Sequence, residues 1–263
     1  MASDSRKVAL VTGAARGIGL AAATRFLQDG WRVAMLDILG DTLRSAVNEL
    51  GGDAESILAV EADVSDPKAV RTAVQDVHRK FGRIDALVNN AGIAVFKPML
   101  DTTVEEWQRV LAVNLTGPFI MTQAVAPIMR DQGGGAIVNI ASISGLRAST
   151  MRVAYGTSKA GVAHLTKQQA VELAQYRIRV NAVAPGPVDT AMAKEVHTPA
   201  IRADYHDHIP LARYGLEGEL ANAIFFLCGE QAAYITGQTL AVDGGFDAAG
   251  VGLPTLRGER RNE

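Results

Sequence analysis

The chain has 263 residues, 48% of them hydrophobic, with a formal net charge of −2 and a sequence pI near 6.2. This length and apolar content predict a sizeable core, and we expect residues 1–263 to form one domain. Because the chain has no basic excess for contacts with a phosphate backbone, the composition argues against a nucleic-acid partner.

Short apolar segments alternate along the chain with segments of helical periodicity. Strands are expected, in order, at KVALVTG, WRVAMLD, SILAVEADV, IDALVNNAG, GGAIVNIAS, IRVNAVAPG and TLAVDGG. Helices are expected over residues 18–29 and 40–50, from Asp66-Pro67 onward, twice within 103–131, over about 153–175 and over 217–228. This alternation predicts an α/β fold in which right-handed crossovers build a parallel sheet with helices on both faces.

Two stretches do not follow this pattern. Residues 190–212 have no clear period, and we expect a mobile lid over the substrate there. The tail, residues 247–263, contains Gly and Pro and then becomes charged, so it either covers a neighbouring subunit's cleft or is disordered, with disorder favoured at its very end.

Three features of the sequence bear on the cellular compartment of the protein. The run GPFIMTQAVAPIM is interrupted by polar residues and Pro127, so no membrane-spanning segment is expected. The N-terminal apolar run is only VALV and leads into a glycine motif, which indicates a strand rather than a signal peptide. The single cysteine, Cys228, lies in an apolar run, which predicts a buried, unreactive thiol and fits a reducing compartment. We therefore expect a cytoplasmic protein.

A glycine-rich turn, TGAARGIG (Thr12 to Gly19), follows the first expected strand and opens the first helix. Its spacing is G-x-x-x-G-x-G, and its glycines let a pyrophosphate approach the backbone at a helix N-terminus. The candidate cofactor-binding residues here are Gly13, Arg16, Gly17, Ile18 and Gly19. A tight strand–helix turn without a ligand is the alternative.

Asp37 ends the second expected strand, 18 residues beyond Gly19. A carboxylate at this point can accept hydrogen bonds from ribose hydroxyls and repels a 2′-phosphate, which favours NAD over NADP. Asp37 could instead cap the next helix, although Asp41 could also do that. Arg16 argues the other way, because it could reach a 2′-phosphate.

The ends of the third and fourth expected strands complete the candidate cofactor site. Asp63 and Val64 would lie beside an adenine ring in a doubly wound sheet. Asn90 and Gly92 belong to the stretch NNAG, whose small and amide side chains suit the floor of a cofactor pocket. An ordinary loop acid and a plain turn are the alternatives.

Taken together, these residues resemble the short-chain dehydrogenase/reductase family. TGAARGIG, NNAG, Asn114, Ser142, YGTSK (residues 155–159), PGPVDT (residues 185–190) and TGQTLAVDGG (residues 236–245) have the order and spacing of its motifs, over about residues 6–246. The resemblance implies a Rossmann-type fold with seven parallel strands, a nicotinamide cofactor, a homotetramer and a catalytic tetrad of Asn114, Ser142, Tyr155 and Lys159. It also implies that Pro185 and Gly186 shape the nicotinamide pocket, and that Val188 and Thr190 contact its carboxamide.

Within this tetrad, Tyr155 is the expected acid/base. An unperturbed phenol has a pKa of about 10, and a nearby cation lowers it. Lys159 lies one helical turn away, so we expect it to lower the pKa of Tyr155 and also to bind the nicotinamide ribose. Ser142 would donate a hydrogen bond to the substrate oxygen, although it could be a strand-end cap. Asn114 would hold a water that links Lys159 to solvent, or it could mark a helix kink.

The substrate cleft is expected beyond the carboxyl ends of the strands, with Ser144, Arg152 and Pro187 as candidate contacts. The HDH triplet at 206–208 does not predict a metal site, because residues two apart do not face one another on a helix. The leading functional hypothesis is an NAD-dependent dehydrogenase for a secondary alcohol, polyol or cyclic alcohol. A 3-oxoacyl-[acyl-carrier-protein] reductase and a non-catalytic NAD-sensing regulator remain as alternatives.

Overall fold

In the computed structural model, residues 5–51, 55–190, 193 and 196–250 are described, and a seven-stranded sheet forms the centre of the molecule. Every neighbouring pair of strands is parallel, and the order β3-β2-β1-β4-β5-β6-β7 confirms the predicted doubly wound sheet. The strands are β1 (Val8–Thr12), β2 (Arg32–Asp37), β3 (Ile57–Glu61), β4 (Ala86–Asn89), β5 (Gly135–Ile140), β6 (Ile178–Pro185) and β7 (Thr239–Val242).

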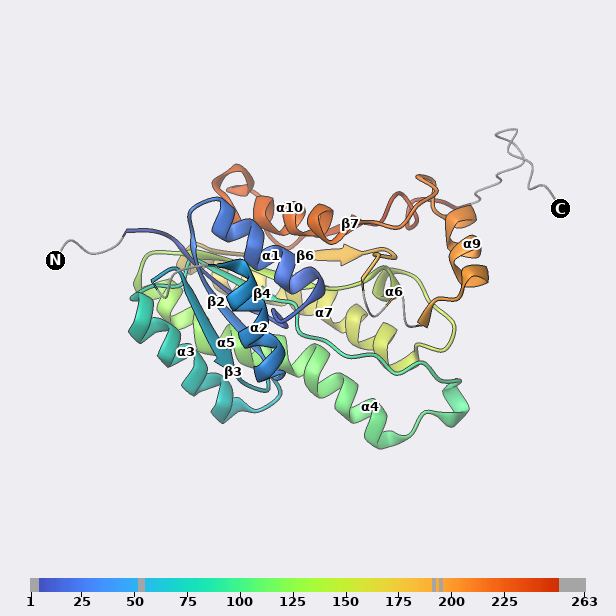
Figure 1. Cartoon of the computed structure of the whole chain (residues 1–263), viewed down its shortest axis with the longest axis horizontal. Helices are drawn as coiled ribbons and strands as arrows, with labels where there is room; N and C mark the ends of the chain where they lie inside the picture. Colours follow the sequence, from blue (N-terminus) through green and yellow to red (C-terminus); the bar gives the residue numbers. More distant parts are fainter. Residues whose placement is uncertain (1–4, 52–54, 191–192, 194–195, 251–263) are drawn as a thin grey trace.

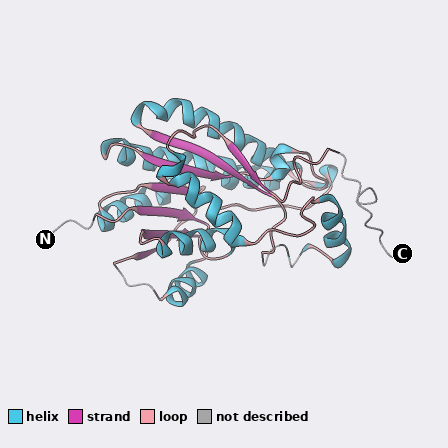
Figure 2. Cartoon of the chain, turned by 90° about the horizontal axis from the view of Figure 1, so that it is seen from above, coloured by secondary structure: helices cyan, strands magenta, loops and turns pink. Residues whose placement is uncertain are grey.

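Helices cover both faces of the sheet (Figures 1 and 2). The cluster on one face includes α1 (Gly17–Gln28), α2 (Gly40–Leu50) and α10 (Glu217–Cys228). The cluster on the other face includes α3 (Pro67–Phe81), α5 (Gly117–Asp131) and α7 (Val153–Leu173). The strand order reverses between β1 and β4, and such a reversal opens a crevice at the carboxyl ends of the strands.

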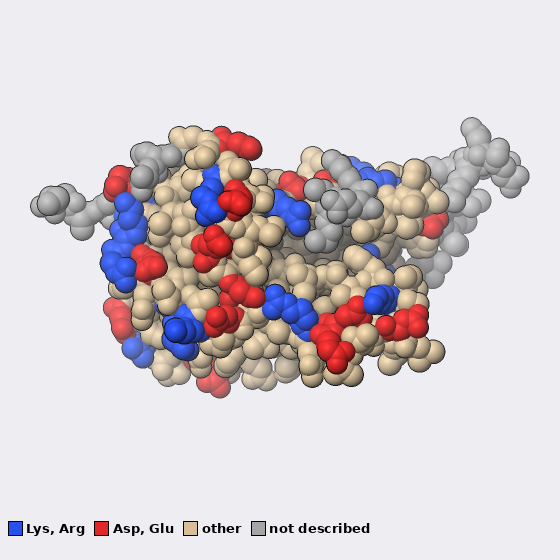
Figure 3. All heavy atoms as spheres, turned by 60° about the horizontal axis from the view of Figure 1, so that its bottom comes forward, with Lys and Arg blue, Asp and Glu red and all other residues tan. Residues whose placement is uncertain are grey.

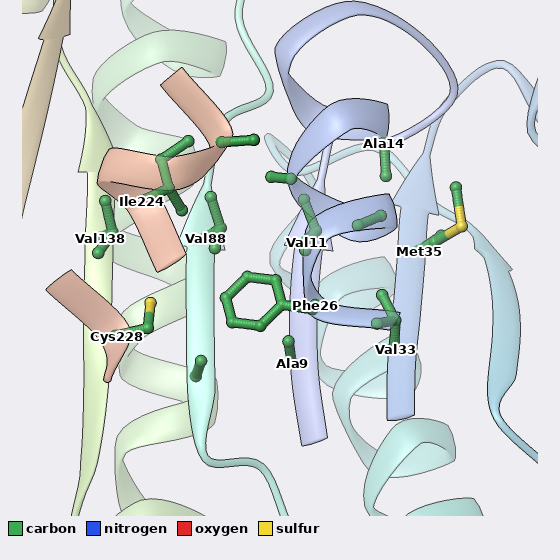
Figure 4. Close-up of a cluster of buried hydrophobic side chains, with 14 of the residues drawn as sticks. Ala9, Val11, Ala14, Phe26, Val33, Met35, Val88, Val138, Ile224 and Cys228 are labelled. Carbon is green, nitrogen blue, oxygen red and sulfur yellow. The ribbon is translucent and has the colours of Figure 1, made fainter. Parts of the chain in front are cut away.

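The apolar cluster under α1 and α10 shows why these segments fold as they do (Figure 4). Phe26 is fully buried, and its ring lies 5.0 Å from Trp31 and 5.3 Å from Phe225 between ring centroids. Cys228 is buried in the same cluster, and burial raises the pKa of its thiol to about 12. The prediction of a buried thiol is confirmed, and at neutral pH it is held in its protonated, unreactive form.

The segment 103–131 differs from its prediction as two helices. It is one continuous helix in which α4 (Val104–Leu111) passes through a π-helical turn, η2 (Ala112–Thr116), into α5. Among the described residues, Val104–Asp131 is also the one helix whose length and composition would suit a membrane span, which the sequence analysis did not expect. Half of its most apolar window is buried in the protein, as in the core helix of a globular protein.

Two further helices lie where no helix was predicted. The turn after β5 forms α6 (Ile143–Leu146), and α9 (Pro199–His208) lies inside the stretch that has no clear period. The α9 helix begins with a usual signal, because the Thr198 hydroxyl accepts a hydrogen bond from the Ile201 N–H and Pro199 occupies the first turn. The prediction of a lid over 190–212 falls partly on residues 191, 192, 194 and 195, which lie outside the described residues. The predictions for the tail also fall largely outside them, from residue 251 onward.

Candidate active site

A cavity of about 530 Å³ opens at the carboxyl ends of the strands, where the order reverses. The face seen in Figure 3 is hollowed right of its centre, with acidic and basic side chains interspersed on it. The predicted site residues that line the cavity are Gly13, Arg16, Gly17, Ile18, Asp37, Asp63, Val64, Asn90, Gly92, Ser142, Arg152, Tyr155, Lys159, Pro185, Gly186, Pro187, Val188 and Thr190. Gly19, Asn114 and Ser144 do not line it.

We call the part formed by Gly13 to Ile18, Asp37, Asp63 and Val64 the glycine-turn end of the cavity. We call the part formed by Phe96, Ser142, Arg152, Tyr155, Pro187, His197 and Tyr205 the Tyr155 end. The first end lies beyond β1, β2 and β3, and the second lies mainly beyond β5 and β6. The sheet order therefore separates two regions with different chemistry.

The glycine turn is held closely against the end of β4. Gly13 has φ +63°, and a Cβ there would lie 2.8 Å from the Ala91 Cα. A Cβ on Gly19 would overlap the Gly13 carbonyl, so Gly19 shapes the turn from behind without lining the cavity. The Asn90 amide donates to the carbonyls of Thr12 and Gly13 at 2.9 and 3.0 Å, which fixes the turn to the next strand.

Asp37 lies at the end of β2 with only 8% of its surface exposed. Its carboxylate accepts hydrogen bonds from the N–H groups of Ala15 and Leu39, both at 3.0 Å. The contact to Leu39 lies at the start of α2, so a local structural role exists beside the cavity-lining one. Asp41 forms a surface ion pair with Arg44 and does not cap the helix.

Arg109 is a residue of the glycine-turn end that the sequence analysis missed. It projects from α4, lines the cavity and pairs with Asp63 at 3.1 Å, while Ser65 also hydrogen-bonds Asp63. Partial burial of Asp63 favours a raised pKa, but the hydrogen bonds from Ser65 and Arg109 outweigh it and lower the pKa. Since 46 residues separate Asp63 and Arg109, no local pattern could have revealed this pair.

The structure brings Ser142, Tyr155 and Lys159 together at the Tyr155 end. The Lys159 Nζ lies 5.8 Å from the centroid of the Tyr155 ring and donates to the Ile140 carbonyl at 2.6 Å. The Ser142 hydroxyl lies close enough to Tyr155 to lower the pKa of its phenol, and the Ser142 Oγ accepts a hydrogen bond from the Ser144 N–H at 3.1 Å at the start of α6. Ser142 is therefore the strand-end cap considered from the sequence and also lines the cavity, while its hydrogen bond to a substrate oxygen stays a prediction.

Lys159 was expected to lower the pKa of Tyr155, but in this structure the pKa of Tyr155 is raised. Burial raises the pKa of Tyr155, and the opposing effects of the Ser142 hydroxyl and the Arg152 charge are smaller. Burial also lowers the pKa of Lys159 to about 8. The physical reason is that both groups leave water together, and each then disfavours its own charged form. Tyr155 is consequently a protonated phenol at neutral pH.

Asn114 lies in the π-helical turn and is fully buried. Its side chain accepts from the Ile93 N–H at 2.8 Å and donates to the Ile93 carbonyl at 2.9 Å and the Ser158 Oγ at 3.0 Å. These bonds join the loop after β4 to α7, the helix that carries Tyr155 and Lys159. Helices often kink at a π-helical turn, so the interpretation of Asn114 as marking a helix kink fits this backbone.

The predicted substrate contacts separate into two kinds. Arg152 and Pro187 line the cavity, whereas Ser144 is buried and accepts a 3.3 Å hydrogen bond from Arg152. His197 and Tyr205, from the segment expected to be a lid, also line the cavity. The His197 Nδ1 lies 2.9 Å from the Tyr214 hydroxyl, and burial, followed by the charges of Arg152 and Arg202, lowers the pKa of His197.

The two histidines of the HDH triplet make separate contacts. His206 packs against the Tyr214 ring, and the His208 Nδ1 lies 2.7 Å from the Asp204 carbonyl oxygen. Within the described residues, no group of three or more His, Cys, Asp or Glu side chains could hold a metal ion.

The fold and cavity have the form of a dinucleotide-binding α/β protein, and comparisons with known proteins identify the family. A family model described as enoyl-(acyl carrier protein) reductase matches residues 13–247. The chain is 44% identical over 247 residues to 2-(R)-hydroxypropyl-CoM dehydrogenase of Xanthobacter autotrophicus, covering 92% of this chain and 99% of that protein. It is 42% identical over 239 residues to a 3-oxoacyl-[acyl-carrier-protein] reductase of Thermotoga maritima, covering 91% and 97%.

A solved structure of 7α-hydroxysteroid dehydrogenase, complexed with NADH and 7-oxo glycochenodeoxycholic acid, superimposes with a TM-score of 0.87. It is 36% identical to this chain and covers 91% of this chain and 93% of its own. The chain belongs to the short-chain dehydrogenase/reductase family and is an oxidoreductase of that family.

Members of this family use nicotinamide cofactors and act on small molecules. The residues present fit such a cofactor. Gly13 lines the cavity at a point where a Cβ would clash with the Ala91 backbone, so the turn needs glycine there, and Asp37 offers a carboxylate at the end of β2. The cavity continues from there to Tyr155, so one ligand could span both ends.

Proposed function

We propose that the chain, as one domain over residues 1–263, interconverts a secondary alcohol and a ketone with NAD(H). The observation that carries this proposal is the meeting of Ser142, Tyr155 and Lys159 in the same cavity as the glycine turn and Asp37. A regulator that only sensed NAD would not need these three side chains around one open space. We also propose that the protein is a homotetramer, which the family resemblance implies, and that it is cytoplasmic, which its single buried cysteine favours.

In the proposed chemistry, a nicotinamide cofactor held by the glycine turn and Asp37 would supply the hydride acceptor for alcohol oxidation and the hydride donor for ketone reduction. Tyr155 exchanges the proton: it takes the hydroxyl proton in oxidation and returns one to the carbonyl oxygen in reduction. Ser142 donates a hydrogen bond to that oxygen and stabilises its developing charge. Lys159, with a pKa of about 8, is mostly charged at neutral pH and would offset part of the cost of burying the phenolate when Tyr155 has given up its proton.

The residues assigned to the cofactor follow the order of the cavity. Gly13, Arg16, Gly17, Ile18 and Gly19 would form the pyrophosphate turn, and Asp37 would accept the ribose hydroxyls. Asp63 and Val64 would lie at the adenine. The nicotinamide half of the cofactor would be bordered by Asn90, Gly92, Pro185, Gly186, Val188 and Thr190. Asn114 would act from behind the cavity, through the loop it holds and a water near Lys159.

The preference for NAD rests on Asp37. Its carboxylate is buried at the cavity wall, where the charge of a 2′-phosphate would be repelled with little screening by water. Arg16 also lines this end and is the residue that would favour NADP. We weight Asp37 more heavily because its position is held by two backbone hydrogen bonds.

A 3-oxoacyl-[acyl-carrier-protein] reductase is the second candidate, favoured by the similarity to the Thermotoga maritima enzyme. The two candidates separate in one experiment. Binding of NADH and NADPH is compared by fluorescence, and the preferred cofactor is then assayed with secondary alcohols, polyols, cyclic alcohols and small ketones, and with a 3-oxoacyl thioester. Our proposal expects tighter NADH binding and turnover of free alcohols or ketones. Turnover of the thioester alone, with NADPH preferred, would replace it by the second candidate.

A further inference from the structure

The charges that line the cavity are unequally distributed between its two ends. The carboxylates among the lining residues, Asp37 and Asp63, both belong to the glycine-turn end. Arg152 lines the Tyr155 end. The nearby Arg202 forms a 2.7 Å ion pair with Asp189, which offsets its charge.

Arg152 has only neutral partners in the part of the chain that the structure describes. Its guanidinium donates to the Ser144 Oγ at 3.3 Å and to the Tyr205 hydroxyl at 3.4 Å, and it lies 5.1 Å from the Phe96 ring centroid. No carboxylate among the described residues forms an ion pair with it. These two hydrogen bonds are long, so a carboxylate or sulfonate oxygen would be a stronger acceptor than either hydroxyl.

Arg152 is also close to the reacting groups. It is the residue that precedes α7, three positions before Tyr155, and its charge lowers the pKa of both Tyr155 and His197, though burial affects each pKa more. The lowered pKa of His197 favours its neutral form, so the positive charge at this end comes from Arg152 and, beside Tyr155, from Lys159, whose Nζ is engaged with the Ile140 carbonyl. The surroundings of Phe96, His197 and Tyr205 reduce the water around this charge, which strengthens its attraction for an anion.

We propose that Arg152 binds an anionic group, a carboxylate or a sulfonate, on the substrate whose alcohol or ketone carbon lies at Tyr155. This inference rests on the proposed function and adds the substrate class to it. Ser144 is a positioning residue in this arrangement, because it holds the guanidinium from the buried side. The planar fork of arginine can bind two oxygens of such a group at once.

The test uses secondary alcohols of graded length that end in a carboxylate or a sulfonate. Each is matched by its neutral primary amide or sulfonamide. For the length that fits, the wild type should have a kcat/KM about 10- to 100-fold higher for the anion than for its neutral match, as expected for a hydrogen bond to a charged group. Comparing the carboxylate series with the sulfonate series shows which anion is recognised.

Arg152→Gln should remove this preference mainly through KM for the anionic compounds, so that the ratio of kcat/KM for the anion to that for its neutral match falls to about one. Arg152→Lys keeps the charge but not the fork and should restore part of the preference. Arg147→Gln is the matched control. Arg147 lies on the same connection but donates to the Phe246 and Ala249 carbonyls outside the cavity lining, so its variant should retain the full preference.

Two results would overturn the inference. One is a wild type that turns over neutral and anionic members equally well. The other is an Arg152→Gln variant that loses both to the same extent, because Arg152 would then only position its neighbours. If no alcohol or ketone is turned over, the proposed function fails by itself. Calorimetric titration of wild type and Arg152→Gln with the carboxylates, in the presence of NADH, then decides the inference separately.

Discussion

At the glycine-turn end of the cavity, one local turn of the backbone packs closely against β4, whereas the Tyr155 end is built from side chains of separate segments. The first end depends on Gly13 and Gly19, which allow close approach, and on the Asn90 bonds that hold the turn. The second depends on Arg152, His197 and Tyr205, which come from separate segments. In the proposed function, the glycine-turn end would hold the cofactor, and the Tyr155 end would hold the substrate.

The largest expected effect tests the group at the junction of the two ends. Tyr155→Phe removes the proton donor but keeps the ring, so kcat should fall by about 100- to 10,000-fold. NADH binding, measured by fluorescence, should remain near the wild-type value because the glycine-turn end is unchanged. Tyr176→Phe, which alters an exposed tyrosine beyond the far end of α7, is the control. Wild-type kcat in Tyr155→Phe would disprove the mechanism.

An intermediate effect is expected from a change confined to the glycine-turn end. Asp37→Ala removes a carboxylate that would bind ribose hydroxyls and repel a 2′-phosphate. The ratio of kcat/KM with NAD to that with NADP should fall by about 10- to 100-fold, the range for hydrogen bonds to charged groups. Asp41→Ala, the control, removes an exposed acid from the first turn of α2 and should leave this ratio unchanged. A wild type that uses NADPH faster than NADH would contradict this assignment.

The smallest single step, up to tenfold for each pH unit, is expected from pH, and it concerns the Tyr155 end. Because burial raises the pKa of Tyr155, the phenol stays protonated at neutral pH. Reduction, which needs the proton, should change little between about pH 6 and 8, whereas kcat/KM for oxidation should rise by up to tenfold per pH unit. Above about pH 8 Lys159 loses its charge, and the rise should flatten. A reduction rate that increases with pH over this range would show that another group supplies the proton.

The sequence analysis predicted the glycine-turn end more completely than the Tyr155 end. Gly13 to Gly19 form one local turn, and Asp37, Asp63 and Asn90 each follow a strand whose apolar run is visible in the sequence. In a parallel sheet these strand ends must meet at one edge. Arg109 was missed because its partner Asp63 is distant in sequence, and α9 was missed because its apolar positions have no helical period.

The sequence by itself determined the order of the strands and of most helices, the glycine turn and the spacing of Tyr155 and Lys159, because each depends on local periodicity or on neighbours within a few residues. Only the tertiary structure decided that Ser144 lies behind Arg152, that α9 brings Tyr205 over the cavity, and that burial raises the pKa of Tyr155. These properties depend on which distant segments exclude water from the same space, and electrostatic interactions strengthen where water is excluded.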